Sequence, residues 1–168
     1  ALKAGLGAQG KSLDVFGLGG PRLRAAGMRV VVDASGLRSM GFSEIFLKLP
    51  IFFRALKRLE KAARKEKPDV AVLIDYPDFH FRLAARLRRL AVPTVNYIPP
   101  KVWAWRRKRI FQLKRSYDLI LSILPFEEAM FSQYGVRATY VGNPLVDALR
   151  AAPAQEVARR ELGLPATG

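Results

Sequence analysis

Short apolar runs alternate with longer amphipathic stretches along most of the chain. The runs are rich in valine and isoleucine, and the nearly continuous run DVAVLID (69–75) is typical of a strand buried on both faces of a sheet. The pattern predicts strands over residues 14–18, 29–33, 69–75, 92–98, 118–124 and 137–141.

Between these runs, apolar residues recur at three- and four-residue steps, as on one face of an amphipathic helix. We predict a short helix from Pro21 and further helices over 43–67, 79–90, 126–134 and 155–162. Proline lacks the N–H that continues a helix, so Pro68 should end the long helix and Pro50 should kink it or divide it in two.

Strands and helices that alternate at this spacing require crossover connections, which are right-handed and give parallel strands. We therefore predict an α/β fold, a Rossmann-like parallel sheet with helices on both faces. Residues 151–168, rich in alanine, proline and glutamate, are expected to form a linker with one helix.

The predicted helix over 43–67 has two different faces. Its cations fill one face and the C-terminal end. Its apolar residues form a stripe that begins just before the helix and includes Leu56 and Leu59 in its second half. The first six residues of the stripe are Phe42, Ile45, Phe46, Leu49, Phe52 and Phe53. One interpretation is an ordinary helix with a buried face. The other is a helix that lies in an anionic membrane surface, with those six leading residues in contact with lipid.

Composition narrows the class of protein. With 168 residues, half of them hydrophobic, the chain is long enough for one folded domain. The net charge of +15 points to a polyanionic partner such as an anionic membrane, a phosphorylated substrate or nucleic acid, although a merely solvated basic surface is the alternative.

Other kinds of site are disfavoured. Without cysteine the chain has no disulfide or thiolate metal site, and with His80 as its single histidine we expect no metal centre and no catalytic triad. No apolar run approaches the length of about 18 residues that a membrane-spanning helix needs, and the N-terminus does not resemble a signal peptide. We expect a cytoplasmic protein.

Aromatic and cationic residues are most concentrated in NYIPPKVWAWRRKR (96–109), which contains both tryptophans of the chain beside a cluster of cations. Tryptophan suits a position with one apolar and one wet side, and arginine suits phosphate, so this stretch is a candidate for binding lipid or sugar phosphates. Aromatic residues interleaved with arginine also stack on RNA bases, but no RNA-recognition signature is present, so nucleic acid is not the expected partner.

Two carboxylates follow the predicted strand over 69–75. Ligands of open parallel sheets bind outside the carboxyl ends of the strands, and IDYPDF places Asp75 at such an end, with Asp78 in the next loop. Either carboxylate is a candidate general base. A structural role is the alternative for both, and for Asp78 that role is to cap the helix that begins near Phe79.

Two glycine turns are weaker candidates. GLGGP follows a strand and precedes a helix, so the backbone at Gly19 and Gly20 is a candidate for contact with an anion or a sugar. It lacks the GxGxxG spacing because Arg22 occupies the place of the third glycine. Asn143, in a similar turn at a later strand end, is a candidate hydrogen-bond partner of a ligand; a simple turn is the alternative at both places.

A family resemblance joins these stretches. The chain resembles the N-terminal half of bacterial lipid-A-disaccharide synthases from about residue 16 to residue 149. The resemblance is carried, in order, by FGLGGPRLRAAG, MGFSEIF, KPDVAVLIDYPDF, YIPPKVWAWRRKRI, DLILSILPFE and YGVRATYVGNPLVDAL.

The resemblance implies a GT-B-type architecture, in which two Rossmann-like domains face a cleft. Residues 1–150 would be the N-terminal acceptor and membrane domain without its first strand, and 151–168 the linker and start of the donor domain. It also implies an inverting transfer of 2,3-diacylglucosamine from its UDP donor to 2,3-diacylglucosamine 1-phosphate, without metal or cofactor, at the cytoplasmic face of the inner membrane.

Site residues follow from the same resemblance. Asp75 matches the first acid of the family's D-x-P-D-F motif and is the expected base, with Asp78 second. The expected substrate-binding residues are Gly19, Gly20, Trp103, Trp105, Arg106, Arg109 and Asn143.

The chain departs from the family pattern at several positions. Tyr76 stands where the family commonly has alanine, and His80 where it has asparagine. The residues before Val102 read PPK instead of SPS, and GNP replaces GHP at 142–144, so a polar role at those positions is not carried over.

The resemblance also places parts of the enzyme outside this segment. The family's opening strand would precede Ala1 and the donor-binding domain would follow Gly168, so we do not expect these residues to catalyse transfer alone. The rival interpretations are a non-catalytic basic module that binds anionic membrane or RNA, and a lipid glycosyltransferase of the same architecture with another acceptor. Loss of transfer without loss of binding on replacing Asp75 would separate the enzyme from the binding module.

Overall fold

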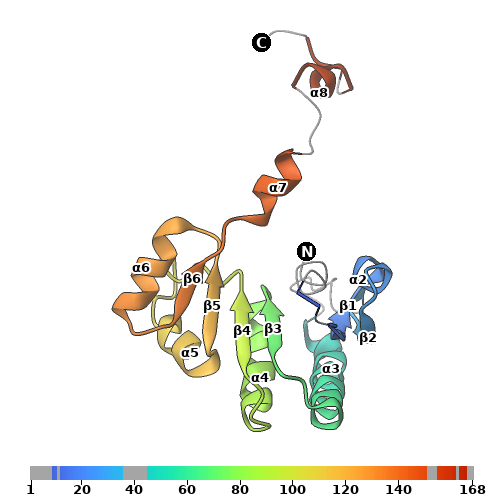
Figure 1. Cartoon of the computed structure of the whole chain (residues 1–168), viewed down its shortest axis with the longest axis vertical. Helices are drawn as coiled ribbons and strands as arrows, with labels where there is room; N and C mark the ends of the chain where they lie inside the picture. The colour runs from blue at the N-terminus through green and yellow to red at the C-terminus, as the bar shows by residue number, and fades with distance from the viewer. Residues whose placement is uncertain (1–8, 11, 36–44, 151–154, 162, 166–168) are drawn as a thin grey trace.

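The computed structural model describes residues 9–10, 12–35, 45–150, 155–161 and 163–165 (Figure 1). Their strands are β1 (Phe16–Gly19), β2 (Arg29–Asp33), β3 (Ala71–Ile74), β4 (Thr94–Tyr97), β5 (Leu119–Ser122) and β6 (Ala138–Tyr140). Their helices are α2 (Pro21–Ala25), α3 (Ile45–Glu66), α4 (Pro77–Arg88), α5 (Arg109–Ser116), α6 (Pro125–Gln133), α7 (Pro144–Arg150) and α8 (Gln155–Glu161).

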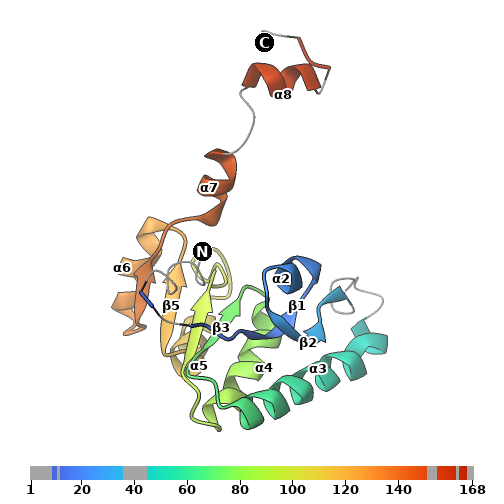
Figure 2. The same cartoon turned by 45° about the vertical axis from the view of Figure 1, so that its right-hand side comes forward.

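All strand pairs are parallel, as predicted, and each strand lies inside or within a residue of its predicted range. The pairing forms two sheets instead of the single sheet expected: β1 pairs with β2, and the second sheet has the order β3-β4-β5-β6. Within the described residues, β1 and β3 each pair along one edge only. Helices pack against both sides of the parallel strands (Figures 1 and 2).

The core lies between the strands and the row of helices α3, α4 and α5. Helix α3 contacts β2 and α4, and α4 also contacts β3, β4 and α5. The largest fully buried apolar side chains come from these helices, from β5 and from α6: Leu56, Phe79, Leu113, Ile120 and Phe131. The opposite face of β3 is uncovered, because Val70, Val72 and Ile74 are exposed.

Helix α3 runs without interruption from Ile45 to Glu66, so of the two effects predicted for Pro50, a kink or a division, the division is wrong. Pro50 lies in the second described turn, where its missing N–H removes one hydrogen bond close to the start of the helix. The second half of the apolar stripe is core, with Leu56, Leu59 and Ala63 buried.

The first half of the stripe contains both a partly buried residue and exposed residues. Phe52 is half-buried and meets the edge of the Phe79 ring at 5.1 Å between centroids, so it packs against the core. Leu49 and Phe53 are exposed, as is Ile51, which the stripe did not include. Phe42 and the side chains of Ile45 and Phe46 lie outside the described residues.

Helices α5 and α7 were not predicted, although a crossover between the parallel strands β4 and β5 requires an intervening segment such as α5. Both are short, which leaves few turns over which a periodic pattern is visible. In Figures 1 and 2, α7 and α8 extend away from the four-stranded sheet beyond the carboxyl ends of its strands. Among the described helices, none is both long and apolar enough to cross a bilayer.

Candidate functional site

The carboxyl ends of β3, β4 and β5 meet at one edge of the four-stranded sheet. The register pairs Ile74 with Tyr97 and Tyr97 with Leu121. The pairing continues one residue further, because the Asp75 N–H donates to the Tyr97 oxygen at 3.0 Å and the Ile98 N–H donates to the Leu121 oxygen at 3.2 Å. Asp75 therefore sits at the edge where ligands of open parallel sheets bind, as predicted.

The backbone at this edge is strained. Asp75, Tyr76 and Ile98 have φ angles of 53°, 48° and 62°, in the left-handed region that favours glycine. Such a conformation costs roughly 1–2 kcal/mol for each non-glycine residue, and the β-branched side chain of Ile98 makes it less favourable still. Strain of this kind gathers at functional sites, where surrounding contacts hold it in place.

His80 stabilises the strained turn through a hydrogen bond to its main chain. Its Nδ1–H donates to the main-chain oxygen of Asp75, which fixes the neutral tautomer with the proton on Nδ1, since a carbonyl only accepts. The ring is buried against the rings of Tyr76 and Phe79. Burial lowers the pKa of His80 below its ordinary value, so the ring is neutral at pH 7. The histidine thus serves a structural purpose at the site.

The two carboxylates are in different surroundings. Asp78 is the second residue of α4 and not its cap; the N-cap is Tyr76, which makes no side-chain capping bond, so the capping expectation for Asp78 is wrong. Its Oδ1 accepts from Arg109 Nη2 at 2.9 Å. The Asp75 side chain is exposed, and within the described residues its carboxylate has no hydrogen-bond or ion-pair partner. Of the two carboxylates, Asp75 is therefore the one without a partner among the described residues.

The loop between β4 and α5 is anchored by Trp103. Its Nε1 donates to Glu127 Oε1 at 3.2 Å, and its ring meets the Phe126 ring edge-on at 5.3 Å. Glu127 is 1% exposed, and its second oxygen accepts from the Leu124 N–H at 3.3 Å. Sequence reasoning missed Glu127; its spacing of three residues from Leu124, at the start of a helix, was the available signal.

The part of this loop that follows Trp103 faces solvent. Trp105 is 60% exposed, and the guanidinium of Arg106 lies 4.8 Å from the centre of its ring. Arg106 itself has a φ of 55°, and Arg107 and Lys108 are exposed beside it. The loop therefore presents an aromatic side chain and exposed cations to solvent, and arginine is suited to binding phosphate.

Comparison with known proteins identifies the family. The family model described as lipid-A-disaccharide synthetase matches residues 2–167. The chain belongs to the lipid-A-disaccharide synthase family. These are glycosyltransferases of lipid A biosynthesis with the GT-B fold, which agrees with the parallel α/β arrangement found here.

The chain is 44% identical to the lipid-A-disaccharide synthase of Myxococcus xanthus over 163 residues, which are 97% of this chain and 43% of that protein. It is 44% identical to the Solibacter usitatus synthase over 85% of this chain and 38% of the relative. It is 43% identical to the synthase of an Anaeromyxobacter species over 92% of this chain and 40% of the relative. The chain thus spans about two fifths of the length of these synthases.

The remaining predicted site residues of this synthase-family chain lie on elements other than the turn that contains Asp75. Gly19 ends β1 and Gly20 precedes α2, beside the two-stranded sheet. A Cβ at Gly19 would meet Leu23 at 3.1 Å, so packing alone accounts for that glycine. Asn143 Oδ1 accepts from the Leu145 N–H at 3.0 Å, which caps the start of α7.

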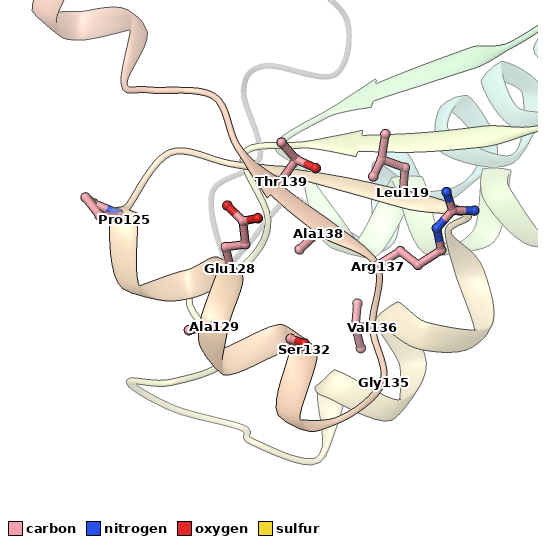
Figure 3. Close-up of a pocket in the computed structure, with 10 residues that line it drawn as sticks. All are labelled: Leu119, Pro125, Glu128, Ala129, Ser132, Gly135, Val136, Arg137, Ala138 and Thr139. Atoms are coloured by element: carbon pink, nitrogen blue, oxygen red, sulfur yellow. The ribbon is translucent and has the colours of Figure 1, made fainter.

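A hollow of about 770 Å³ opens between α6 and the strands β5 and β6 of this synthase-family chain (Figure 3). Glu128, Ser132, Arg137 and Thr139 supply its polar side chains, and Glu128 also accepts from the Tyr140 N–H at 2.8 Å. Among the described residues that line it, none is a predicted site residue. Within the same described residues no three histidine, aspartate or glutamate side chains gather as a metal-binding group.

Proposed function

We propose that the protein containing this chain is an inverting glycosyltransferase. It transfers 2,3-diacylglucosamine from its UDP donor to 2,3-diacylglucosamine 1-phosphate and forms the β-1,6-linked disaccharide phosphate and UDP. The family match over residues 2–167 supports the reaction class, and the names of the relatives support the product. The observation that carries the proposal is Asp75, an exposed carboxylate on a strained turn at the carboxyl edge of the sheet.

Asp75 is the proposed general base. In an inverting transfer the acceptor 6-hydroxyl attacks the anomeric carbon and loses its proton to a base, while the bond from that carbon to UDP breaks. Asp75 has a free carboxylate, whereas the Asp78 carboxylate is held by Arg109 at 2.9 Å. The Asp78 oxygen that accepts from Arg109 is already occupied, so Asp78 comes second.

The cationic loop is the proposed binding site for the acceptor. Arg106, Trp105 and Trp103 follow β4 in the chain, and β4 is the neighbour of the strand that Asp75 ends. The Arg109–Asp78 ion pair joins the start of α5 to the start of α4 and so orients the loop that precedes α5. At Gly19, Gly20 and Asn143, any substrate contact would come from the main chain or from the Asn143 amide.

We further propose that residues 1–150 form the acceptor domain and that 151–168 lead into the donor domain. The unpaired edges of β1 and β3 support the insertion of one more parallel strand between the two sheets. That strand would merge the two sheets into the single sheet of a Rossmann-like domain.

The test of the reaction uses the full-length protein with UDP-2,3-diacylglucosamine and 2,3-diacylglucosamine 1-phosphate. We expect the wild type to release disaccharide and UDP, and Asp75→Asn to lower kcat by about 100-fold or more, the usual contribution of a general base. Asp78→Asn should cost less, because it removes a partner of Arg109 and leaves the base.

Each result separates a different alternative. Equal product from wild type and Asp75→Asn would keep the enzyme and refute Asp75 as its base. Absence of product from the wild type, with binding to anionic vesicles retained, would refute the transfer reaction in favour of a basic membrane-binding module.

A further inference from the structure

A groove of about 440 Å³ lies between α5, α6 and the loop that contains Val102. This volume is within the roughly 300–1,000 Å³ of small-molecule sites in proteins. Trp103 forms one wall of the groove, and residues of α5 and α6 form the others. Trp103 is also among the residues proposed to bind the acceptor, so the groove adjoins that proposed site.

The floor and walls of the groove are apolar. Val102 and Ile110 are buried beneath it, and Met130 contributes a flexible apolar side chain. Phe111 and Tyr134 form a wall in which the two rings meet edge-on at 6.3 Å, and both are exposed, at 53% and 41%. Exposed aromatic rings that line a groove are costly to leave in water, so an apolar occupant would stabilise them.

The charge of the groove is of one sign. Arg107 and Lys108 are the ionic residues among those that line it, and within the described part of the chain neither forms an ion pair. Both immediately precede α5, whereas Phe111 lies inside α5, so the cations stand at one end of the apolar wall. The Glu127 carboxylate is buried, and its two oxygens accept from Trp103 Nε1 and from the Leu124 N–H.

We propose that this groove binds one acyl chain of the phosphorylated acceptor and that Arg107 and Lys108 bind its phosphate. An apolar trough with cations at one end is complementary to an alkyl chain that ends in an anion. A flat nucleobase would need hydrogen-bond partners, and Gln133 is the one amide side chain among the described lining residues. The assignment rests on the proposed function, which supplies an acceptor with both acyl chains and a phosphate.

The test measures binding without transfer, by titration calorimetry of the full-length protein with dodecyl phosphate below its critical micelle concentration. Dodecyl maltoside has the same chain without the phosphate, and inorganic phosphate lacks the chain. We expect both to bind at least about tenfold more weakly than dodecyl phosphate. Shortening the probe to octyl phosphate should also weaken binding by more than about tenfold, because four methylenes leave the groove.

Variants locate the site. Phe111→Ser and Arg107→Glu should each weaken dodecyl phosphate binding by about fivefold or more, since they remove apolar contact and charge respectively. The matched controls are Leu145→Ser, at another exposed apolar residue, and Arg115→Glu, at an exposed cation within α5. They should bind the probe as the wild type does. Thermal unfolding of each variant checks that the fold is intact.

The outcomes distinguish this site from the transfer reaction. Retained catalysis with dodecyl phosphate binding that is unchanged by Phe111→Ser and Arg107→Glu overturns the groove and leaves the proposed reaction standing. Binding that is lost only in those two variants supports the groove even if the transfer assay fails. If anionic vesicles bind through Phe111 while monomeric dodecyl phosphate does not bind, the face contacts a bilayer and the proposal is wrong.

Discussion

The left-handed backbone at Asp75 and Tyr76 is held by side chains of α4. His80 donates to the Asp75 oxygen, and the Tyr76 ring stacks on the Phe79 ring with 5.7 Å between centroids. The sequence shows Asp75 at the end of an apolar run, which was enough to place it at the edge of the sheet. Its φ angle depends on contacts that form only when α4 packs against β3, so the strain was not predictable from local pattern.

The same distinction holds at Trp103. The aromatic and basic composition of its loop marked it as a candidate site, but the bond from Trp103 to Glu127 spans 24 residues. Likewise the Arg109–Asp78 pair spans 31 residues and joins two predicted site residues to each other. Residue type therefore identified the candidates, while tertiary contacts decided which of them remain free for a ligand.

The buried His80 should make stability depend on pH. Burial lowers its pKa in the folded protein, so below the unfolded value of about 6.5 the unfolded chain binds a proton that the folded chain resists. The stabilising contribution is complete above about pH 6.5 and is lost progressively as the pH falls toward the lowered folded value. Its loss has a maximum slope of about 1.4 kcal/mol per pH unit.

Urea unfolding between pH 7.5 and pH 5 measures this loss. His80→Asn is the informative variant, because an asparagine amide also has an N–H to donate to the Asp75 oxygen but does not titrate. We expect the wild type to lose free energy of unfolding on acidification and the variant to show a flatter profile. Parallel profiles for the two proteins would rule out His80 as the titrating group.

Four helices end in the same hydrogen-bonded turn, which needs one residue with a left-handed backbone. In three of them this residue is glycine, and in the fourth it is alanine. At the ends of α2, α6 and α8 the left-handed position is Gly27, Gly135 and Gly163, with φ angles of 79°, 65° and 66°. At the end of α4 it is Ala91, with a φ of 56°. The Ala91 and Val92 N–H groups donate to the Arg88 and Leu87 oxygens at 3.0 and 3.1 Å, which is the pattern of a Schellman motif.

Ala91→Gly should therefore stabilise the protein. Relief of the left-handed alanine is worth roughly 1–2 kcal/mol, and the greater entropy of glycine in the unfolded chain offsets about half of it. Ala91 is exposed, so its methyl group is not part of the core. We expect the free energy of unfolding to rise by about 0.5–1 kcal/mol, measured by chemical denaturation.

The reciprocal control is Gly135→Ala at the end of α6. An added Cβ there would strain the backbone and meet Lys114 Nζ at 2.8 Å, a flexible group that can move aside. Gly135→Ala should thus lower stability by about 1 kcal/mol. If both substitutions changed stability in the same direction, backbone strain would not be the controlling factor at these helix ends.

At the scale of elements, periodicity identified the strands and the long helices but not their pairing. Leu73 of β3 and Ile120 of β5 are buried in the core, as are Leu56 and Leu59 on the apolar stripe of the long helix. The separation of β1–β2 from β3–β6 was not predictable from the runs themselves, since an apolar strand reads the same whether one edge or both are paired.

The molecule as a whole combines a net charge of +15 with apolar side chains exposed at the start of α3. Leu49, Ile51 and Phe53 are about 40% exposed, and exposed cations follow them along the same helix: Arg54, Lys57, Arg58, Lys61, Arg64 and Lys65. The arrangement fits a helix whose first half enters an anionic bilayer surface while the second half binds its headgroups. We propose it as the membrane contact of the protein, on the cytoplasmic face of the inner membrane.

Sedimentation with phosphatidylglycerol-containing vesicles tests that contact. The double variant Leu49→Ser, Phe53→Ser should partition about tenfold more weakly, because it removes two apolar side chains from the interface. Raising the salt from about 0.05 M to about 0.5 M should weaken wild-type binding as well, because the headgroup attraction is screened over a few ångströms. Thermal stability should change little, since both side chains are partly exposed in the folded chain.

The matched control is Leu145→Ser, Leu149→Ser, which removes two exposed leucines of α7. It should bind vesicles as the wild type does if α3 is the membrane contact. An equal loss in the two double variants would mean that the protein adheres through any exposed apolar residue. Salt-sensitive binding that neither variant weakens would mean that the positive charge alone attracts the protein. Only a loss specific to α3 combined with sensitivity to salt supports a bilayer contact built from both halves of this helix.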